Sequence, residues 1–129
     1  MQQILILGGG AAGLAAALAA AQSLRPGTAQ VTILERNPHP GKKLLATGNG
    51  RCNLNNAAIS PDKYFTSAPK ALTSLLAAAD RADPLGWFRS LGLLTRTDET
   101  GRVYPYSNQA ADVLALLERH LEQKGVEVR

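Results

Sequence analysis

Cysteine and aromatic residues are scarce in this sequence of 129 residues. The one cysteine, Cys52, leaves no second thiol for an internal disulfide, which suits a cytoplasmic protein in a reducing environment. Aromatic side chains account for 5% of the chain and are absent from residues 36–51, where positive charge gathers. Surfaces that bind nucleic acids usually combine positive charge with aromatic rings, so we expect no nucleic-acid partner.

The features of a secretory leader and of a membrane span are also missing, although residues 4–21 carry no charge. No Lys or Arg precedes this stretch, and the glycines Gly8, Gly9 and Gly10 interrupt it. A leader has a basic start and a continuous apolar centre, and a membrane helix needs about 20 predominantly apolar residues. We therefore expect no membrane contact and interpret residues 4–21 as a buried strand, a turn and a buried helix.

The composition is typical of a globular domain, with 45% hydrophobic and 19% charged residues. The net charge is +4. Four of the 14 basic residues lie together in a segment without acids, and the other ten balance the ten acidic residues. These four are Arg36, Lys42, Lys43 and Arg51. The excess charge is therefore either a solvated surface or a site for an anion.

The first 34 residues predict a strand, a helix and a second strand. Residues 3–7 form a short apolar run, residues 11–23 are rich in Ala and Leu, and residues 30–34 are apolar and partly β-branched. Two such strands joined by a helix form a βαβ unit, whose strands lie parallel and side by side. We therefore expect an α/β fold of the Rossmann type, a parallel sheet flanked by helices.

The remainder of the chain predicts further elements. Residues 36–62, rich in Pro, Gly and Asn, are expected to form a long loop. Ser67, Asp83 and Asn108 are each expected to cap a helix, the last with an apolar stripe. The members of this stripe are Ala110, Val113, Leu114, Leu117 and Leu121. Residues 93–97 and 102–104 are expected to pair as a hairpin, and residues 126–129 to begin another strand.

The glycine spacing near the N-terminus carries the functional prediction. Gly8, Gly10 and Gly13 form the pattern G-x-G-x-x-G between the first strand and the first helix. Gly8 permits the sharp turn, Gly10 lets a pyrophosphate approach the backbone, and Gly13 lets the helix press against the sheet. The start of the helix offers unpaired N–H groups and partial positive charge to phosphates. The alternative, a glycine turn in a nucleotide-free domain, has the same spacing.

An acid at the end of the second strand completes the pattern. Glu35 follows Gly13 by 22 residues, the usual place for the group that accepts hydrogen bonds from a ribose diol. Its negative charge selects against a 2′-phosphate, although Arg36 beside it can soften that repulsion. The spacing therefore predicts an adenine dinucleotide and leaves FAD, NAD and NADP open.

A longer motif adds a resemblance to a known family. The segment GKKLLATGNGRCN at residues 41–53, GRVYP at residues 101–105 and the strand after Gly125 resemble the BaiN and aminoacetone oxidase family of bacterial FAD-dependent oxidoreductases. Asn55 stands where the family usually has Thr, and both are small polar residues. Family members are roughly three times longer, with a substrate domain and a C-terminal segment that returns to the flavin.

The resemblance implies a set of cofactor-binding residues. It implies that Gly8, Gly10, Ala12 and Gly13 hold the pyrophosphate, and that Glu35 and Arg36 lie on the ribose side. It assigns Lys42, Lys43 and Gly48 to the flavin half of FAD. Residues 1–129 then form the N-terminal part of an FAD-binding domain, incomplete at its C-terminus, where residues 126–129 only begin a strand.

No residue in the chain is predicted to be catalytic or to bind a metal. Cys52 lacks a Cys-x-x-Cys partner, and such a residue is more often small and buried than reactive. His39 and His120 have no neighbours at metal-ligand spacing. The flavin itself therefore performs the electron transfer in this hypothesis.

Two alternatives remain open at this point. One is an NADP-binding dehydrogenase domain, in which Arg36 recognises a 2′-phosphate. The other is a truncated, catalytically inert module. A nanomolar site needs about 12 kcal/mol and a helix N-terminus contributes at most about 2 kcal/mol, so we expect the 129 residues alone to bind FAD weakly.

Overall fold

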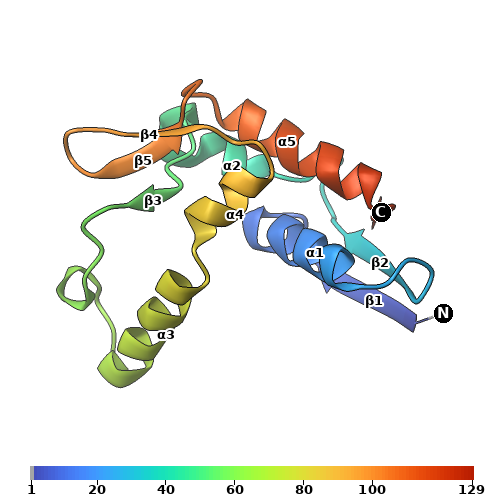
Figure 1. Cartoon of the computed structure of the whole chain (residues 1–129), viewed down its shortest axis with the longest axis horizontal. Helices are drawn as coiled ribbons and strands as arrows, with labels where there is room; N and C mark the ends of the chain where they lie inside the picture. The colour runs from blue at the N-terminus through green and yellow to red at the C-terminus, as the bar shows by residue number, and fades with distance from the viewer. Residues whose placement is uncertain (1) are drawn as a thin grey trace. The chain divides into compact units, whose positions relative to one another are not determined.

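The computed structural model describes residues 2–129, and these divide into two compact units. The first unit joins the segment that ends at Cys52 to Ser107–Arg129, and the second unit is Asn53–Tyr106. In Figure 1 the first unit therefore contains both the blue and the red ends of the colour scale. We describe each unit separately.

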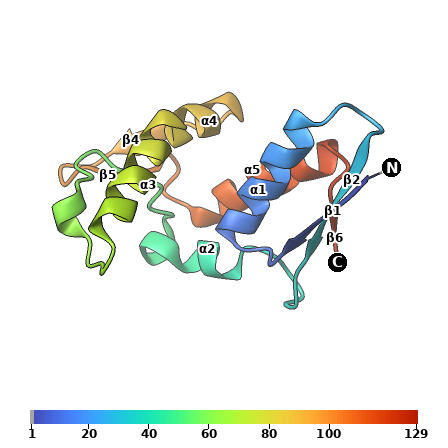
Figure 2. The ribbon, with the colours of Figure 1, turned by 90° about the horizontal axis from the view of Figure 1, so that it is seen from below.

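The first unit contains the predicted βαβ arrangement. Its strands and long helices are β1 (Gln2–Leu7), α1 (Ala11–Ser23), β2 (Ala29–Leu34), α5 (Ala110–Gln123) and β6 (Glu127–Val128). The strands form a parallel sheet in the order β1-β2-β6. Figure 2 shows α1 and α5 on the same side of these strands. The Rossmann-like layering of a parallel sheet and helices is confirmed.

The core of the first unit lies between the sheet and its helices. Leu14 and Leu18 of α1, Ile33 of β2, and Val113 and Leu117 of α5 have 0–1% of their surface exposed. Burying one such side chain is worth about 1.5–3 kcal/mol. The apolar stripe predicted for the last helix is confirmed, because all five of its members are buried. The strand predicted after Gly125 is also confirmed, since β6 pairs with β2.

The cap predicted at the start of α5 is wrong. Gln109, not Asn108, is the N-cap residue, and no side chain caps this helix. Asn108 has a φ of 59°, a left-handed conformation that Asn tolerates better than most residues. This backbone conformation places Asn108 before the cap position, and its Oδ1 atom is buried without a hydrogen-bond partner among the described residues.

The long loop predicted over residues 36–62 is also partly wrong. Two short helices, α2 (Lys42–Ala46) and η1 (Thr47–Gly50), interrupt it within the first unit. Leu44 of α2 is buried, and the Thr47 hydroxyl donates a hydrogen bond to the Leu44 carbonyl over 2.6 Å. Leu44 therefore packs this segment against the core, which the high content of Gly, Pro and Asn in the sequence did not indicate.

The second unit combines a small antiparallel sheet with two helices. Its elements are β3 (Asn55–Asn56), η2 (Pro61–Lys63), α3 (Pro69–Arg81), α4 (Pro84–Ser90), β4 (Thr95–Thr97) and β5 (Arg102–Pro105). The strand order is β3-β5-β4, so the predicted hairpin is confirmed as β4 and β5. Asp98 stabilises the hairpin turn, because its Oδ1 accepts hydrogen bonds from the backbone N–H groups of Thr100 and Arg102.

The two caps predicted in the second unit have different outcomes. Asp83 caps α4 as expected, since its carboxylate accepts a hydrogen bond from the Gly86 N–H over 3.0 Å. Ser67 does not cap α3, whose N-cap residue is Ala68. Pro69 explains the shift, because its fixed φ and missing N–H suit the first helical position.

None of the helices within residues 2–129 is both long and apolar enough to cross a lipid bilayer.

Candidate dinucleotide-binding site

The three-glycine turn connects the end of β1 to the start of α1. Gly8 has a φ of 97°, which a residue with a side chain rarely adopts, and its N–H donates to the Leu34 carbonyl over 2.8 Å. Gly10 is the N-cap residue of α1, and its carbonyl accepts the first helical hydrogen bond from Leu14. The turn is therefore held against the end of β2 while the chain reverses into the helix.

Gly10 and Gly13 lack a side chain for different physical reasons. A Cβ atom added at Gly10 would meet no heavy atom within 4 Å, so the space beside this residue is open. A Cβ atom added at Gly13 would lie 1.9 Å from the carbonyl oxygen of Gly8. Gly13 is therefore required by the packing of the protein itself, and Gly10 leaves room beside the start of the helix.

The first turn of α1 is free of groups that would compete with an anion. It contains no acidic residue, and no side chain forms a hydrogen bond to the cap. The first N–H groups of a helix have no partner within the helix and carry partial positive charge. Ala12, in this turn, is exposed and has only a methyl side chain. The arrangement is suited to binding a phosphate through backbone N–H groups.

Glu35 lies directly beside the glycine turn. Its Oε2 atom accepts a hydrogen bond from the Gly9 N–H over 2.6 Å, and its Oε1 atom accepts one from the Asn37 N–H over 2.8 Å. The backbone N–H groups of Asn37 and Gly9, and then the Asn37 side chain, lower the pKa of Glu35, and the positive charge of Arg36 adds to this effect. Glu35 is therefore a carboxylate at neutral pH.

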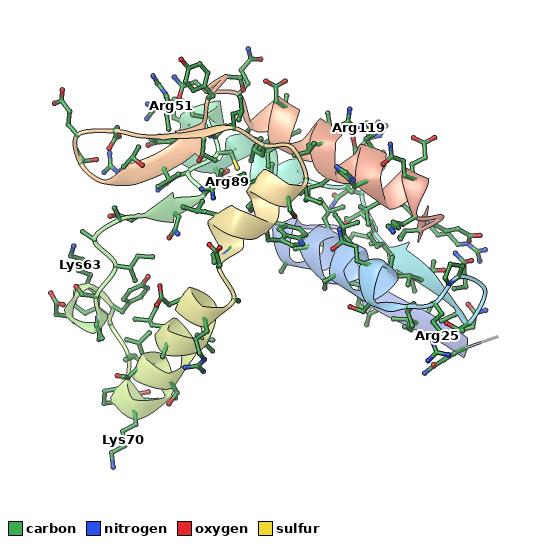
Figure 3. The ribbon with its side chains drawn as sticks, in the orientation of Figure 1. Arg25, Arg51, Lys63, Lys70, Arg89 and Arg119 are labelled. Atoms are coloured by element: carbon green, nitrogen blue, oxygen red, sulfur yellow. The ribbon has the colours of Figure 1, made fainter. Side chains whose placement is uncertain are left out.

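The basic segment is tied to the same turn. The Gly41 N–H donates a hydrogen bond to the Gly9 carbonyl over 2.7 Å, and Lys42 and Lys43 follow as the first residues of α2. Both lysines are exposed. In Figure 3, by contrast, Arg25 lies at the end of α1 that is remote from the glycine turn. The positive charge of Lys42 and Lys43 therefore lies in the segment that is hydrogen-bonded to the turn.

Most of the predicted residues meet around one cleft. This cleft has a volume of about 520 Å³. Its lining includes six of the nine predicted residues, namely Gly8, Gly10, Glu35, Arg36, Lys42 and Lys43. Ala12, Gly13 and Gly48 lie outside the lining. Gly48 is in η1, where its carbonyl accepts hydrogen bonds from the Arg51 backbone N–H and Nε.

The structure also adds lining residues that the sequence prediction missed. Gly9, Leu34, Asn37 and Gly41 all line the cleft. A Cβ atom added at Gly9 would lie 2.9 Å from the Cβ of Pro40 and 3.2 Å from the Cβ of Glu35. The sequence did contain a signal for Gly9. The motif requires glycine only at positions 8 and 10, so the additional glycine between them indicates that a side chain does not fit there.

Cys52 lies in a buried position, as expected for a structural cysteine. It has a φ of 58°. Burial raises the pKa of its thiol, and a hydrogen bond with Thr47 opposes this only in part. Such a thiol is neutral and unreactive at physiological pH. Within residues 2–129, no group of three or more His, Cys, Asp or Glu residues is arranged to hold a metal ion.

Comparison with known proteins identifies the family of this chain. Residues 2–129 match the family model described as HI0933-like protein Rossmann domain. The chain is 47% identical over 128 residues to the 3-dehydro-bile acid delta(4,6)-reductase of Clostridium scindens, covering 99% of this chain and 31% of that protein. It is 27% identical over 125 residues to the ribosomal RNA dihydrouridine synthase of Escherichia coli, covering 97% and 30% of the two chains.

A solved structure supports the same fold. The crystal structure of THI4 from Thermovibrio ammonificans aligns with this chain at a TM-score of 0.55 and 16% sequence identity. The alignment covers 99% of this chain and 38% of the THI4 chain. This likeness concerns the fold alone. The chain spans about a third of the length of the curated relatives described above. Because the family model covers nearly the whole sequence, the chain belongs to the HI0933-like Rossmann domain family.

Proposed function

We propose that this chain is the FAD-binding part of a flavin-dependent oxidoreductase. The observation that carries the proposal is that three features line one cleft: the glycine turn at the start of α1, the Glu35 carboxylate, and the basic residues of the following segment. An adenine dinucleotide combines two phosphates with a ribose diol, and these are the groups that such features recognise.

The phosphate half of the proposal depends on Gly10, Lys42 and Lys43. The open space at Gly10 lets a phosphate reach the N–H groups at the start of α1. Lys42 and Lys43 bring two positive charges to the same cleft. Both lysines are exposed, so we propose that they neutralise the phosphate charge of the cofactor from the solvent side. We expect their contribution to affinity to fall as the salt concentration rises.

The ribose half depends on Glu35. A carboxylate accepts hydrogen bonds from a diol and repels a 2′-phosphate. The lowered pKa of Glu35 supports this discrimination, because the group stays charged at neutral pH. Arg36 lines the same cleft and is the one observation in favour of NADP. The proposal assigns Arg36 to the ribose side of FAD.

The flavin, when bound, supplies the redox chemistry, and this chain supplies binding and orientation. The proposal also assigns Gly48, in η1, to the flavin half of the cofactor. It includes a cytoplasmic location, which suits the buried, unpaired Cys52. We propose no substrate, because the two relatives are named for a bile acid and for ribosomal RNA.

Titration of the purified chain with FAD tests the proposal. Gly10→Ala is the informative variant, because the added methyl group meets no protein atom yet fills the space assigned to a phosphate. We expect saturable FAD binding by the natural sequence and binding by Gly10→Ala at least roughly tenfold weaker, a loss of about 1.4 kcal/mol. Equilibrium dialysis detects both, even where affinity is too low for gel filtration.

Ala16→Ser is the matched control, because Ala16 is an exposed residue further along α1. We expect it to bind FAD as the natural sequence does. Equal FAD binding by the natural sequence and Gly10→Ala would refute the phosphate site. Tighter binding of NADP than of FAD would replace the flavin proposal with the dehydrogenase alternative, and no saturable binding of either would leave an inert module.

A further inference from the structure

Three hydrogen bonds converge on the carboxylate of Glu35, and Asn37 donates two of them. The Asn37 backbone N–H reaches Oε1 over 2.8 Å, and its side-chain Nδ2 reaches the same oxygen over 2.5 Å. The Gly9 N–H reaches Oε2 over 2.6 Å. Glu35, Asn37 and Gly9 all line the cleft beside the glycine turn. The carboxylate is therefore held at both of its oxygen atoms.

The number of acceptor positions shows what this arrangement leaves for a ligand. An ionised carboxylate offers about four lone-pair positions, two on each oxygen. The two donors of Asn37 occupy both positions on Oε1, and Gly9 occupies one position on Oε2. Among the described residues, one acceptor position on Oε2 therefore stays open, and it belongs to the oxygen that is tied to the glycine turn.

We propose that Asn37 is a positioning residue, whose side-chain amide fixes the Glu35 carboxylate so that Oε2 accepts a hydrogen bond from the 2′-hydroxyl of the adenosine ribose in the bound dinucleotide. This inference rests on the proposed function and deepens it. Asn37 acts through Glu35 and is not assigned a contact with the cofactor. A fixed carboxylate loses less conformational freedom on binding, and this pre-organisation favours that hydrogen bond.

The side chain of Asn37, not its backbone, carries this role. Any residue other than proline at this position can donate the backbone N–H, so only the bond from Nδ2 requires an amide. Asn37→Ala removes that bond and leaves the others. Asn37→Asp replaces the donor with a second carboxylate close to Oε1, where like charges repel. Asn37→Ala therefore removes the attraction between the Asn37 side chain and Oε1, and Asn37→Asp replaces it with repulsion.

The first experiment measures binding of FAD and of the FAD analogue that carries 2′-deoxyadenosine. The ratio of the two dissociation constants, deoxy analogue over FAD, measures what the 2′-hydroxyl contributes to binding. Glu35→Ala is expected to reduce this ratio to about one. We expect Asn37→Ala also to lower this ratio towards one, by several fold, and Asn37→Asp to lower it further. A merely structural role would weaken both ligands equally and leave the ratio unchanged.

The second experiment needs no ligand. The pKa of Glu35 is followed by NMR in the natural sequence and in both Asn37 variants. We expect this pKa to rise in Asn37→Ala and to rise more in Asn37→Asp, because the Asn37 amide stabilises the charged form. An unchanged pKa in both variants would overturn the inference whatever the affinity for FAD.

The outcomes separate this inference from the proposed function. If the natural sequence binds neither ligand, the proposed function fails and the inference fails with it. If the natural sequence binds FAD and Glu35→Ala abolishes the discrimination, but Asn37→Ala leaves it intact, the inference alone is overturned. Loss of discrimination in both Glu35→Ala and Asn37→Ala, with a raised Glu35 pKa in Asn37→Ala, supports it.

Discussion

The backbone N–H of Gly41 donates a hydrogen bond to the carbonyl of Gly9 over 2.7 Å. This bond joins the segment that carries Lys42 and Lys43 to the turn that opens α1. Gly41 has a φ of 75°, and a Cβ atom there would lie 2.5 Å from the Cδ1 of Leu114. The basic segment is therefore held between the glycine turn and α5 by a residue whose left-handed backbone and close approach to Leu114 favour glycine.

Gly41→Ala is predicted to destabilise the protein by about 2 kcal/mol or more, from the left-handed backbone and from the overlap with Leu114. Leu114→Ala alone is predicted to cost about 2–5 kcal/mol, because Leu114 is buried. Urea unfolding of the double variant checks the overlap. We expect the double variant to lose less free energy of unfolding than the sum of the two single losses, and strict additivity would contradict the contact.

Gly13→Ala is predicted to lower the free energy of unfolding by about 1–3 kcal/mol, because its Cβ would overlap the Gly8 carbonyl. Gly10→Ala is the matched comparison within the same motif. We expect it to cost at most about 1 kcal/mol, because Gly is preferred over Ala at an N-cap but the added methyl group meets no heavy atom within 4 Å. An equal loss of unfolding free energy in the two variants would contradict the steric overlap at Gly13.

Asp83→Ala is predicted to destabilise the second unit by about 1–2 kcal/mol, because it removes the cap of α4. Asp83 also has a φ of 43°, which Asn tolerates better than Ala does. Asp83→Asn keeps both the cap and the conformation and is therefore expected to retain most of the stability. Thermal unfolding followed by circular dichroism distinguishes them, and similar melting of both variants would count against the cap.

The thiol of Cys52 is predicted to react slowly with iodoacetamide in the folded protein, because burial raises its pKa. The neutral thiol contributes stability that is fully present below the ordinary thiol pKa. That contribution is lost as the pH rises through the raised pKa of the folded state. Alkylation rates measured against pH in native buffer and in urea check this. Equal rates at every pH would contradict the buried environment.

Several features of this protein follow from short-range rules and were therefore predictable. The spacing of Gly8, Gly10 and Gly13 after an apolar run predicts the strand, turn and helix. Gly8 takes the left-handed φ of the turn, and Gly13 lies against the Gly8 carbonyl, so both demands are local. Asp83 followed by Pro84 predicts the start of α4 for the same reason. The apolar stripe of α5 needs only a period of 3.6 residues and a core to face.

Other features depend on contacts that a residue's own neighbours do not reveal. Asn108 has the chemistry of a cap but adopts a left-handed conformation before α5. The segment of residues 36–62 reads as loop because its many Gly, Pro and Asn residues conceal α2 and its buried Leu44. For α2, burial of Leu44 supplies the stabilisation that the local helix propensity lacks.

The sequence by itself determined the family, the βαβ unit, and most of the residues around the cleft. Only the tertiary structure decided that Glu35 is held by Gly9, and that Gly41 fits against Leu114. The physical reason is distance along the chain. A spacing motif records demands within a turn or a strand, whereas hydrogen bonds and close contacts across 26 or more residues exist only once the chain has folded.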